Sequence, residues 1–161
     1  MESESGLVPA RLARGSRCFG AWVGHELVGY GWLSTKSEWI GEVQLEIRLP
    51  AGEAYIWNCV TLARHRRKGV FGSVVTAIVR QGHKEGLARL WIASLDGMGG
   101  KTIQQAGFQP VLRFNSGMRL GLHWLIVSPA QGVDPGLLAS ARKAVAVKQP
   151  LTVRRSVTRR H

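Results

Sequence analysis

The sequence predicts an α/β fold of the mixed α+β kind, in which helices flank one mixed β-sheet. Three observations support this fold class. Residues 18–61 contain strand-like runs separated by turn residues. At Gly69 the spacing of apolar residues changes from two to 3.6, and a short apolar run returns at residues 89–94. A strand, a helix and a second strand in this order predict a right-handed crossover between parallel strands.

The first predicted strands cover residues 18–23 and 27–33. Both runs are apolar, and Gly24, His25 and Glu26 separate them, so a β-hairpin is expected. Residues 42–49 then alternate charged or polar side chains with aliphatic ones four times. This is the period of a half-exposed strand, which is expected at an edge or rim of the sheet.

Residues 53–61 are the predicted central strand. They are rich in aromatic and β-branched residues and alternate little, as in a strand that is covered on both faces. A helix is expected over residues 69–84, because its apolar residues recur at helical spacing. These residues are Phe71, Val74, Val75, Ile78 and Val79. Gly86 ends the helix, and residues 89–94 are expected to lie beside the central strand.

The chain continues with a glycine-rich loop, a short helix over 101–105, and a closing hairpin that turns at residues 115–117. Residues 1–127 are expected to form one domain and residues 128–161 a basic extension. Asp134 and Pro135 suit a helix N-cap and first turn, which predicts a short helix over 135–147. Residues 148–161 have almost no apolar content and are expected to be disordered.

Composition limits the class of protein. The chain has 161 residues, of which 45% are hydrophobic, enough for one core. Cys18 and Cys59 are its two cysteines, and its five histidines lack metal-ligand spacing, so neither a disulfide framework nor a metal site is predicted. The N-terminus is acidic and polar, and the apolar run at 120–127 is less than half of the roughly 20 residues of a membrane span. A soluble, cytoplasmic protein is expected.

The formal charge of +12 is concentrated in two segments. Residues 141–161 contain seven basic residues and no acidic ones, which predicts weak contact with nucleic acid or an anionic surface. The second segment lies between Glu53 and Glu85, where no acidic residue occurs. Its basic residues are Arg64, Arg66, Arg67, Lys68, Arg80 and Lys84.

The turn that leads into the helix at Gly69 is suited to hold a phosphate. Backbone N–H groups in the first turn of a helix have no intrahelical partner, and the helix dipole and nearby basic side chains add positive charge. An anion is therefore expected at this turn. The residues expected to bind it are Arg66, Arg67, Lys68, Gly69, Val70, Phe71 and Gly72.

This turn resembles the coenzyme A loop of the GNAT superfamily, the acetyl-CoA-dependent N-acyltransferases. The family pattern is Arg or Gln, two residues, Gly, one residue, then Gly or Ala, and residues 66–71 follow it except at Phe71. The order of elements over residues 17–114 is also similar. The resemblance implies a GNAT-like mixed sheet in which the central strand, 55–61, splays away from 89–94.

The same resemblance implies a cofactor and a reaction. The pantetheine arm of acetyl-CoA would enter between the splayed strands and contact the backbone of Val60, Thr61 and Leu62. The acetyl group would pass directly to an amine acceptor in a ternary complex.

The sequence departs from the family at several places. Asp96 stands where an Asn is often found, and Ile103 stands where a Tyr often acts as general acid. Some 16 residues precede the first hairpin, where the family has a strand and two helices. A second copy of the chain that covers the hairpin, as a homodimer, is one expectation. A non-catalytic basic module that binds nucleic acid or a protein partner is the alternative function.

Two carboxylates are candidates for the general base. Glu53 begins the central strand and shares its alternation with Tyr55, Trp57 and Cys59; the alternative is a strand-start residue in solvent. Glu46, on the alternating strand, is the rival. Cys59 could in principle take an acetyl group, but an unpaired cysteine on an apolar strand is more often a small core residue.

Overall fold

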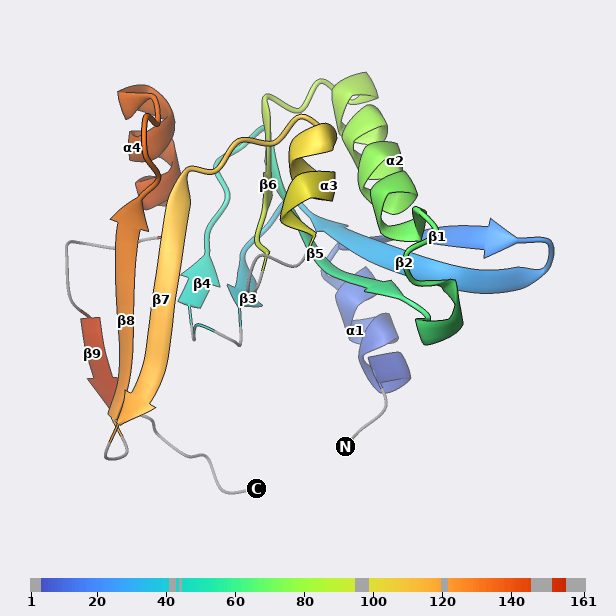
Figure 1. Cartoon of the computed structure of the whole chain (residues 1–161), viewed down its shortest axis with the longest axis horizontal. Helices are drawn as coiled ribbons and strands as arrows, with labels where there is room; N and C mark the ends of the chain where they lie inside the picture. Colours follow the sequence, from blue (N-terminus) through green and yellow to red (C-terminus); the bar gives the residue numbers. More distant parts are fainter. Residues whose placement is uncertain are drawn as a thin grey trace. The chain divides into compact units, whose positions relative to one another are not determined.

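The computed structural model describes residues 4–40, 43, 45–94, 99–119, 122–145 and 152–155 (Figure 1). The chain forms two compact units. The first comprises Met1–Glu38 and Leu49–Phe108, and the second comprises Trp39–Arg48 and Gln109–His161. No helix within the described ranges is long and apolar enough to cross a membrane.

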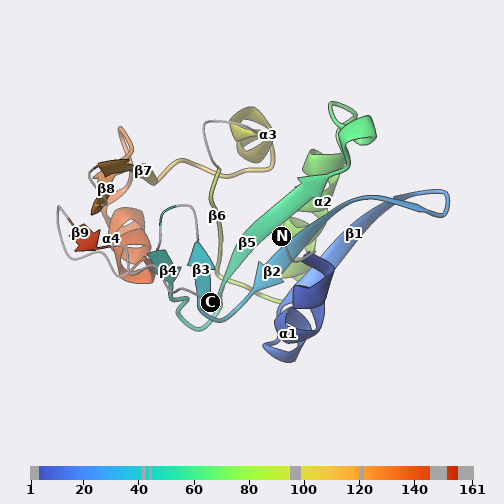
Figure 2. The same ribbon diagram turned by 90° about the horizontal axis from the view of Figure 1, so that it is seen from below.

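The first unit contains most of the predicted α/β elements. Its elements are η1 (Glu4–Leu7), α1 (Val8–Ala13), β1 (Arg17–Val23), β2 (Glu26–Ser34), β5 (Glu53–Thr61), η3 (Ala63–His65), α2 (Val70–Lys84), β6 (Arg89–Ile92) and α3 (Gly100–Gln105). The strands form one sheet in the order β1-β2-β5-β6 (Figure 2). The first two pairings are antiparallel and the β5–β6 pairing is parallel. The predicted hairpin, central strand and parallel crossover are thus confirmed.

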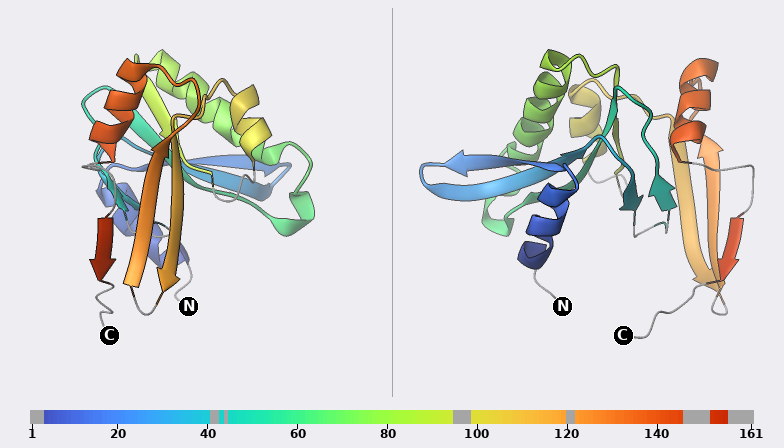
Figure 3. Two further views of the ribbon diagram at one scale, coloured as in Figure 1. Left: turned by 60° about the vertical axis from the view of Figure 1, so that its left-hand side comes forward. Right: turned by 180° about the vertical axis from the view of Figure 1, so that it is seen from behind.

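Helix α2 covers one face of this sheet, and α1 lies on the opposite side (Figures 1 and 3). The core on the α2 side consists of Leu33, Ala54, Ile56, Val74 and Ile78. Glycines in β2 let the helix approach closely. A Cβ added at Gly31 would lie 2.9 Å from Val74 Cγ1, and one added at Gly29 would lie 2.6 Å from Val70 Cγ1. These two glycines therefore fix how near the start of α2 lies to the sheet.

Strand β5 contains a β-bulge at Asn58. Trp57 pairs with Trp32 and Val60 pairs with Tyr30, so two residues of β5 face one residue of β2. Asn58 has a φ of +45°, as an extra residue in a bulge can have. The bulge reverses the alternation of side chains along the strand. Cys59 therefore lies on the α2 face with Gly31, whereas Trp57 lies on the opposite face with Trp32.

Strands β5 and β6 separate halfway along β5. Their pairing runs from Glu53 with Arg89 to Ile56 with Ile92. Beyond Ile56, β5 continues to Thr61, and within the described part of the chain no strand pairs with it on the β6 side. The splayed mixed sheet expected from the resemblance is confirmed.

The second unit contains β7 (Leu112–Arg119), β8 (Leu122–Pro129), α4 (Pro135–Ala144) and β9 (Thr152–Arg155), which follow β4 (Leu45–Ile47) in the chain. β4 pairs with β3 (Glu38–Ile40) in a separate two-stranded sheet, not at the edge of the main sheet. In the main sheet, β2 and β5 pair directly with each other. The short helix predicted over 135–147 is present as α4. The Asp134 carboxylate caps it by accepting the Leu137 N–H at 2.8 Å.

The closing hairpin differs from the expected one. Its strands continue through the predicted turn at 115–117, where Ser116 pairs with Leu125 and Gly117 with Trp124. Gly117 is needed for packing and not for a turn, because a Cβ there would lie 2.6 Å from Trp124 Cζ2. The predicted domain boundary at 127 consequently falls inside β8.

Disorder was expected over 148–161, but Thr152–Arg155 form β9. They pair antiparallel with β8, from Leu122 with Arg155 to Leu125 with Thr152. Strand pairing depends on hydrogen bonds between backbone groups, so a segment that is poor in apolar residues can still form a strand. The remaining residues of this segment lie outside the described ranges.

Candidate active site

The loop between β5 and α2 has the backbone conformation of an anion-binding turn. Arg67 has a φ of +59° and Gly69 a φ of +80°, so left-handed residues alternate along it. Turns of this kind direct successive N–H groups into one concavity. The first bond of α2 runs from the Ser73 N–H to the Gly69 carbonyl at 2.9 Å. The N–H groups of residues 70–72 precede this bond, at the positive end of the helix dipole.

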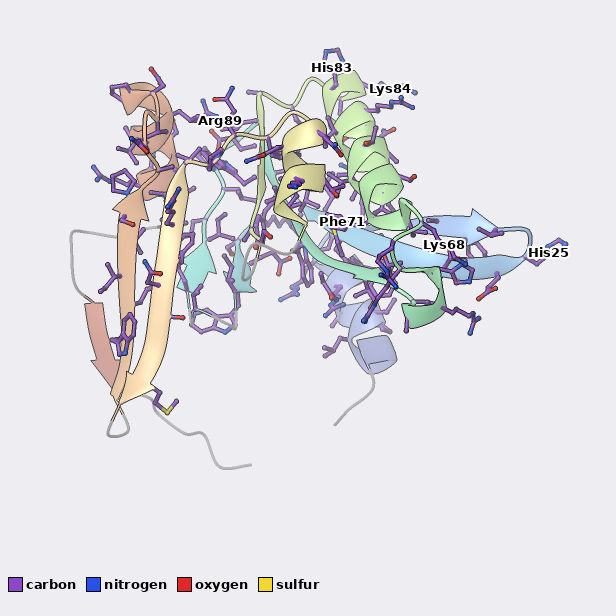
Figure 4. The ribbon with its side chains drawn as sticks, in the orientation of Figure 1. His25, Lys68, Phe71, His83, Lys84 and Arg89 are labelled. Atoms are coloured by element: carbon purple, nitrogen blue, oxygen red, sulfur yellow. The ribbon has the colours of Figure 1, made fainter. Side chains whose placement is uncertain are left out.

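The basic side chains of this loop differ in their partners. Arg64 pairs with Glu26 of the hairpin, and His65 Nε2 lies 3.3 Å from the same carboxylate. The hydrogen bond from Arg64 lowers the pKa of Glu26 below its usual value. In contrast, Arg66, Arg67 and Lys68 are exposed and form no ion pair within the described residues. Figure 4 shows Lys68 and Phe71 together at this end of α2.

The space around the loop suits a pyrophosphate. A Cβ added at Gly69 would meet no atom within 4 Å, so the turn faces open space. Phe71, the departure from the family pattern, packs on the glycine that caps α3. A Cβ added at Gly99 would lie 2.9 Å from Phe71 Cε1. The larger side chain at position 71 is thus matched by a glycine on the neighbouring helix, and the residues present fit a coenzyme A pyrophosphate.

The three residues expected to contact the pantetheine arm are not equivalent. The Leu62 N–H donates to the Val28 carbonyl at 3.0 Å, and the Leu62 carbonyl accepts from His65 N–H at 2.8 Å. Hydrogen-bonding groups alternate in direction along an antiparallel strand. Val60 therefore also directs its backbone groups towards β2, and Thr61 directs its N–H and carbonyl to the side that β6 has left. Thr61 is the residue of the three whose backbone is placed to meet a ligand there.

Glu53 lies at the other end of β5. Its Oε1 accepts from Arg89 Nη1 at 2.7 Å and its Oε2 accepts from Trp91 Nε1 at 2.6 Å. The residue is 8% exposed, so the alternative of a strand-start residue in solvent is wrong. Arg89 lies towards the His83 and Lys84 end of α2, away from Lys68 (Figure 4). At ~3.3 Å per residue, roughly 23–27 Å of strand separates Glu53 from residues 60–61.

The rival Glu46 lies on β4 in the second unit and forms an ion pair with Arg48 at 2.8 Å. The two candidate carboxylates thus belong to different units. Of the other departures from the family, Ile103 is buried in α3, and Asp96 lies outside the described residues.

Cys59 has the environment of a core residue. Its thiol packs beside Gly31 and the core formed with α2, and burial raises its pKa to about 11. A thiol with this pKa is protonated at neutral pH and is a poor nucleophile. The interpretation as a small core residue is therefore supported. No group of three or more potential metal ligands gathers among the described residues.

Sequence reasoning missed a polar cluster on the face of the sheet opposite α2. Glu38 Oε1 accepts from Ser34 Oγ at 2.6 Å and from Ser16 Oγ at 3.1 Å, and Trp57 Nε1 donates to Ser34 Oγ at 2.9 Å. Beside it, the Arg11 guanidinium stacks on Trp32 and Trp57, with its carbon 5.2 and 4.7 Å from the two ring centroids. No residue spacing connects 16, 34 and 38. Ser34 directly follows the apolar run 27–33, where a polar residue is expected at the end of any strand, so the sequence carries no signal for the cluster.

Solved acetyltransferases share this fold. A Bacillus subtilis acetyltransferase in complex with CoA matches with a TM-score of 0.51 and 19% identity, over 71% of this chain and 64% of that one. AAC(6')-Iy in complex with a bisubstrate analogue, CoA-S-monomethyl-acetylneamine, gives 0.54 and 14%, over 73% and 81%. An aminoglycoside acetyltransferase, meta-AAC0020, from an uncultured soil metagenomic sample gives 0.50 and 13%, over 74% and 76%. At these identities the similarity establishes the fold.

The chain has the fold of these acetyltransferases, and its β5–α2 loop has the backbone conformation of an anion-binding turn. A sequence model of the acetyltransferase (GNAT) family matches residues 3–98, more than half of the chain, and the chain belongs to this family. No curated protein matches it. The family's acetyl donor is acetyl-CoA, so the chain is an acetyl-CoA-dependent acetyltransferase.

Proposed function

We propose that this protein transfers the acetyl group of acetyl-CoA directly to an amine acceptor within a ternary complex. The observation that carries the proposal is the course of β5, which runs past its parallel neighbour and leads through a left-handed turn into the start of α2. This arrangement combines the Thr61 backbone, which no described strand pairs with on the β6 side, with a helix start suited to an anion. When bound, acetyl-CoA supplies an activated thioester.

In this proposal each part of the site has a separate role. The N–H groups of residues 67–72 bind the pyrophosphate, and Arg66, Arg67 and Lys68 add positive charge around it. The Thr61 backbone orients the pantetheine arm. Holding donor and acceptor together removes much of the entropic barrier to reaction. Direct transfer is favoured over a covalent route through Cys59, because burial keeps that thiol protonated.

Glu53 and Glu46 are the candidates for the general base. Both Glu53 oxygens already accept a hydrogen bond, and roughly 23–27 Å of strand separates the residue from residues 60–61, so it would act through water. An amine acceptor is supported by the conjugate bound to AAC(6')-Iy, which joins CoA to an acetylneamine. A cytoplasmic location, a homodimer and weak binding of anionic surfaces by the C-terminal basic residues belong to the same proposal.

The test is a calorimetric titration of the full chain with coenzyme A in moderate salt, followed by an assay of coenzyme A release with a panel of primary amines. Specific pyrophosphate binding should persist in salt that weakens non-specific phosphate contacts. Absence of coenzyme A binding would refute the proposal. Binding without turnover on any amine would instead favour a non-catalytic module.

A further inference from the structure

A polar pocket lies in the first unit, where the α1–β1 turn meets the loop after β2. It has a volume of about 150 Å³ and is lined by residues 14–16 and 34–38. A cavity of this size holds about one benzene-sized group. Ser16, Ser34 and Glu38 are buried in it, whereas Arg14 and Lys36 are exposed at its rim.

Among the described residues, the two oxygens of the Glu38 carboxylate differ in their hydrogen bonds. Oε1 accepts both serine hydroxyls, which fix the orientation of the group. Oε2 faces Arg14 Nη2 at 3.6 Å, which is longer than a hydrogen bond. The Arg14 side chain is 59% exposed and can turn into solvent, whereas Glu38 is 7% exposed. Buried carboxylates are normally hydrogen-bonded or paired, and the contact with Arg14 is too long to give Oε2 a hydrogen bond.

We propose that this pocket binds an ammonium group of the acceptor, with Glu38 Oε2 as its ligand in place of Arg14. A primary ammonium is compact and has three donors, so it can bond Oε2 and a serine oxygen at once. An anion is disfavoured because the buried charge is negative. The identity of the ligand as acceptor rests on the proposed function, but the binding of an ammonium group does not.

The place of the pocket along the sheet narrows the class of acceptor. Ser34 pairs with Tyr55, three residues before the bulge at Asn58, which corresponds to about 10 Å along the strand. The donor arm is expected beyond the bulge, beside Thr61. An ammonium bound to Glu38 is therefore a second amino group of the acceptor and not the one that is acetylated. The acceptor class is a flexible diamine or polyamine.

The test is a ¹H–¹⁵N NMR titration of the full chain with spermidine, without coenzyme A, following the backbone amides of residues 34–38. Saturable shifts are expected with spermidine and none with tetramethylammonium at the same ionic strength, because the latter has no N–H donor. Glu38→Gln should weaken spermidine binding about tenfold or more, since a charge-assisted bond is lost. Unchanged affinity in a folded Glu38→Gln would overturn the proposal.

Arg14→Gln is the second variant and keeps the test decisive if Glu38→Gln does not fold. Removing the competing guanidinium should strengthen spermidine binding. If Glu38 only holds the two loops together, no gain in spermidine affinity is expected. Equal or weaker binding in Arg14→Gln would refute the proposal. Coenzyme A titrations of both variants should match the parent. If spermidine binds and coenzyme A does not, the proposed function fails and the pocket assignment stands.

Discussion

Ser73 donates the first hydrogen bond of α2 to the carbonyl of Gly69, a glycine in the left-handed conformation with a φ of +80°. The helix thus begins on a residue that a side chain would strain. Since nothing lies within 4 Å of a Cβ at this position, the open side of the turn is available to a ligand. The left-handed backbone conformation and the open space for a ligand therefore occur at the same residue, Gly69.

Gly69→Val is expected to reduce coenzyme A affinity by at least about tenfold, because a branched side chain would enter the phosphate site. The left-handed φ adds a stability cost of about 1–2 kcal/mol. Gly86→Val is the matched control, since Gly86 has a φ of +69° and equally open surroundings at the other end of α2. Calorimetry should show normal coenzyme A binding in the control. Equal losses in both variants would mean that strain, and not the site, accounts for the effect.

The Arg17–Glu85 pair predicts a pH effect on stability. Hydrogen bonds from Arg17 and then Gln81 lower the pKa of Glu85 from 4.5 to about 2. Because the folded pKa lies below the unfolded one, the contribution is present above pH 4.5 and is lost as pH falls towards 2. The melting temperature of Arg17→Gln should therefore fall less steeply than that of the parent between these values. Parallel curves would show that the pair does not contribute.

Cys59 is expected to be dispensable for catalysis. Cys59→Ala should retain kcat, and iodoacetamide at neutral pH should label the exposed Cys18 before Cys59, whose pKa is about 11. Peptide mass spectrometry identifies the labelled residue. Incubation with acetyl-CoA alone should leave Cys59 unmodified. A stable acetyl group on Cys59, together with loss of turnover in Cys59→Ala, would indicate a covalent route.

Local patterns predicted the elements that depend on local periodicity. The residues of α2 repeat at helical spacing, and β5 is rich in aromatic and β-branched residues with little alternation. The bulge at Asn58 has no such signal, since it arises from the register between β5 and β2. Strict alternation grouped Cys59 with Glu53, whereas the bulge places Cys59 on the opposite face from Trp57. One inserted residue thus reversed the predicted side-chain directions in the C-terminal half of the strand.

A glycine accounts for another difference between the structure and the sequence prediction. The sequence predicts a turn at Gly117, but the residue lies within β7 because Trp124 fills the space of its missing side chain. The sequence correctly placed Gly69 at the start of a helix, because basic residues precede it and an amphipathic pattern follows it. The Glu38 cluster combines residues from the α1–β1 turn, β2 and β3, and contacts of this kind require the tertiary structure.

Glu53→Gln is expected to destabilise the fold and to leave the shape of the pH–rate profile unchanged. Both carboxylate oxygens are bonded in a buried position, so weakening those bonds should cost about 1–3 kcal/mol. Glu46→Gln, in an exposed pair with Arg48, should cost less than about 1 kcal/mol. A general base would instead produce its largest rate loss at low pH, where the amine is protonated. That result for either variant would identify the base.

The pairing of β9 with β8 predicts which part of the C-terminus stabilises the protein. Removing residues 156–161 should leave the melting temperature unchanged, whereas removing 148–161 should lower it, because the second deletion also removes β9. Loss of a few backbone hydrogen bonds, at about 1 kcal/mol each, corresponds to a decrease of several degrees in a chain of this size. The longer deletion also removes more positive charge, so a variant of unchanged charge is needed. Val153→Pro preserves length and charge but breaks the ladder opposite Trp124. It should reproduce the effect of the longer deletion, and a parental melting temperature in Val153→Pro would show that β9 does not contribute to stability.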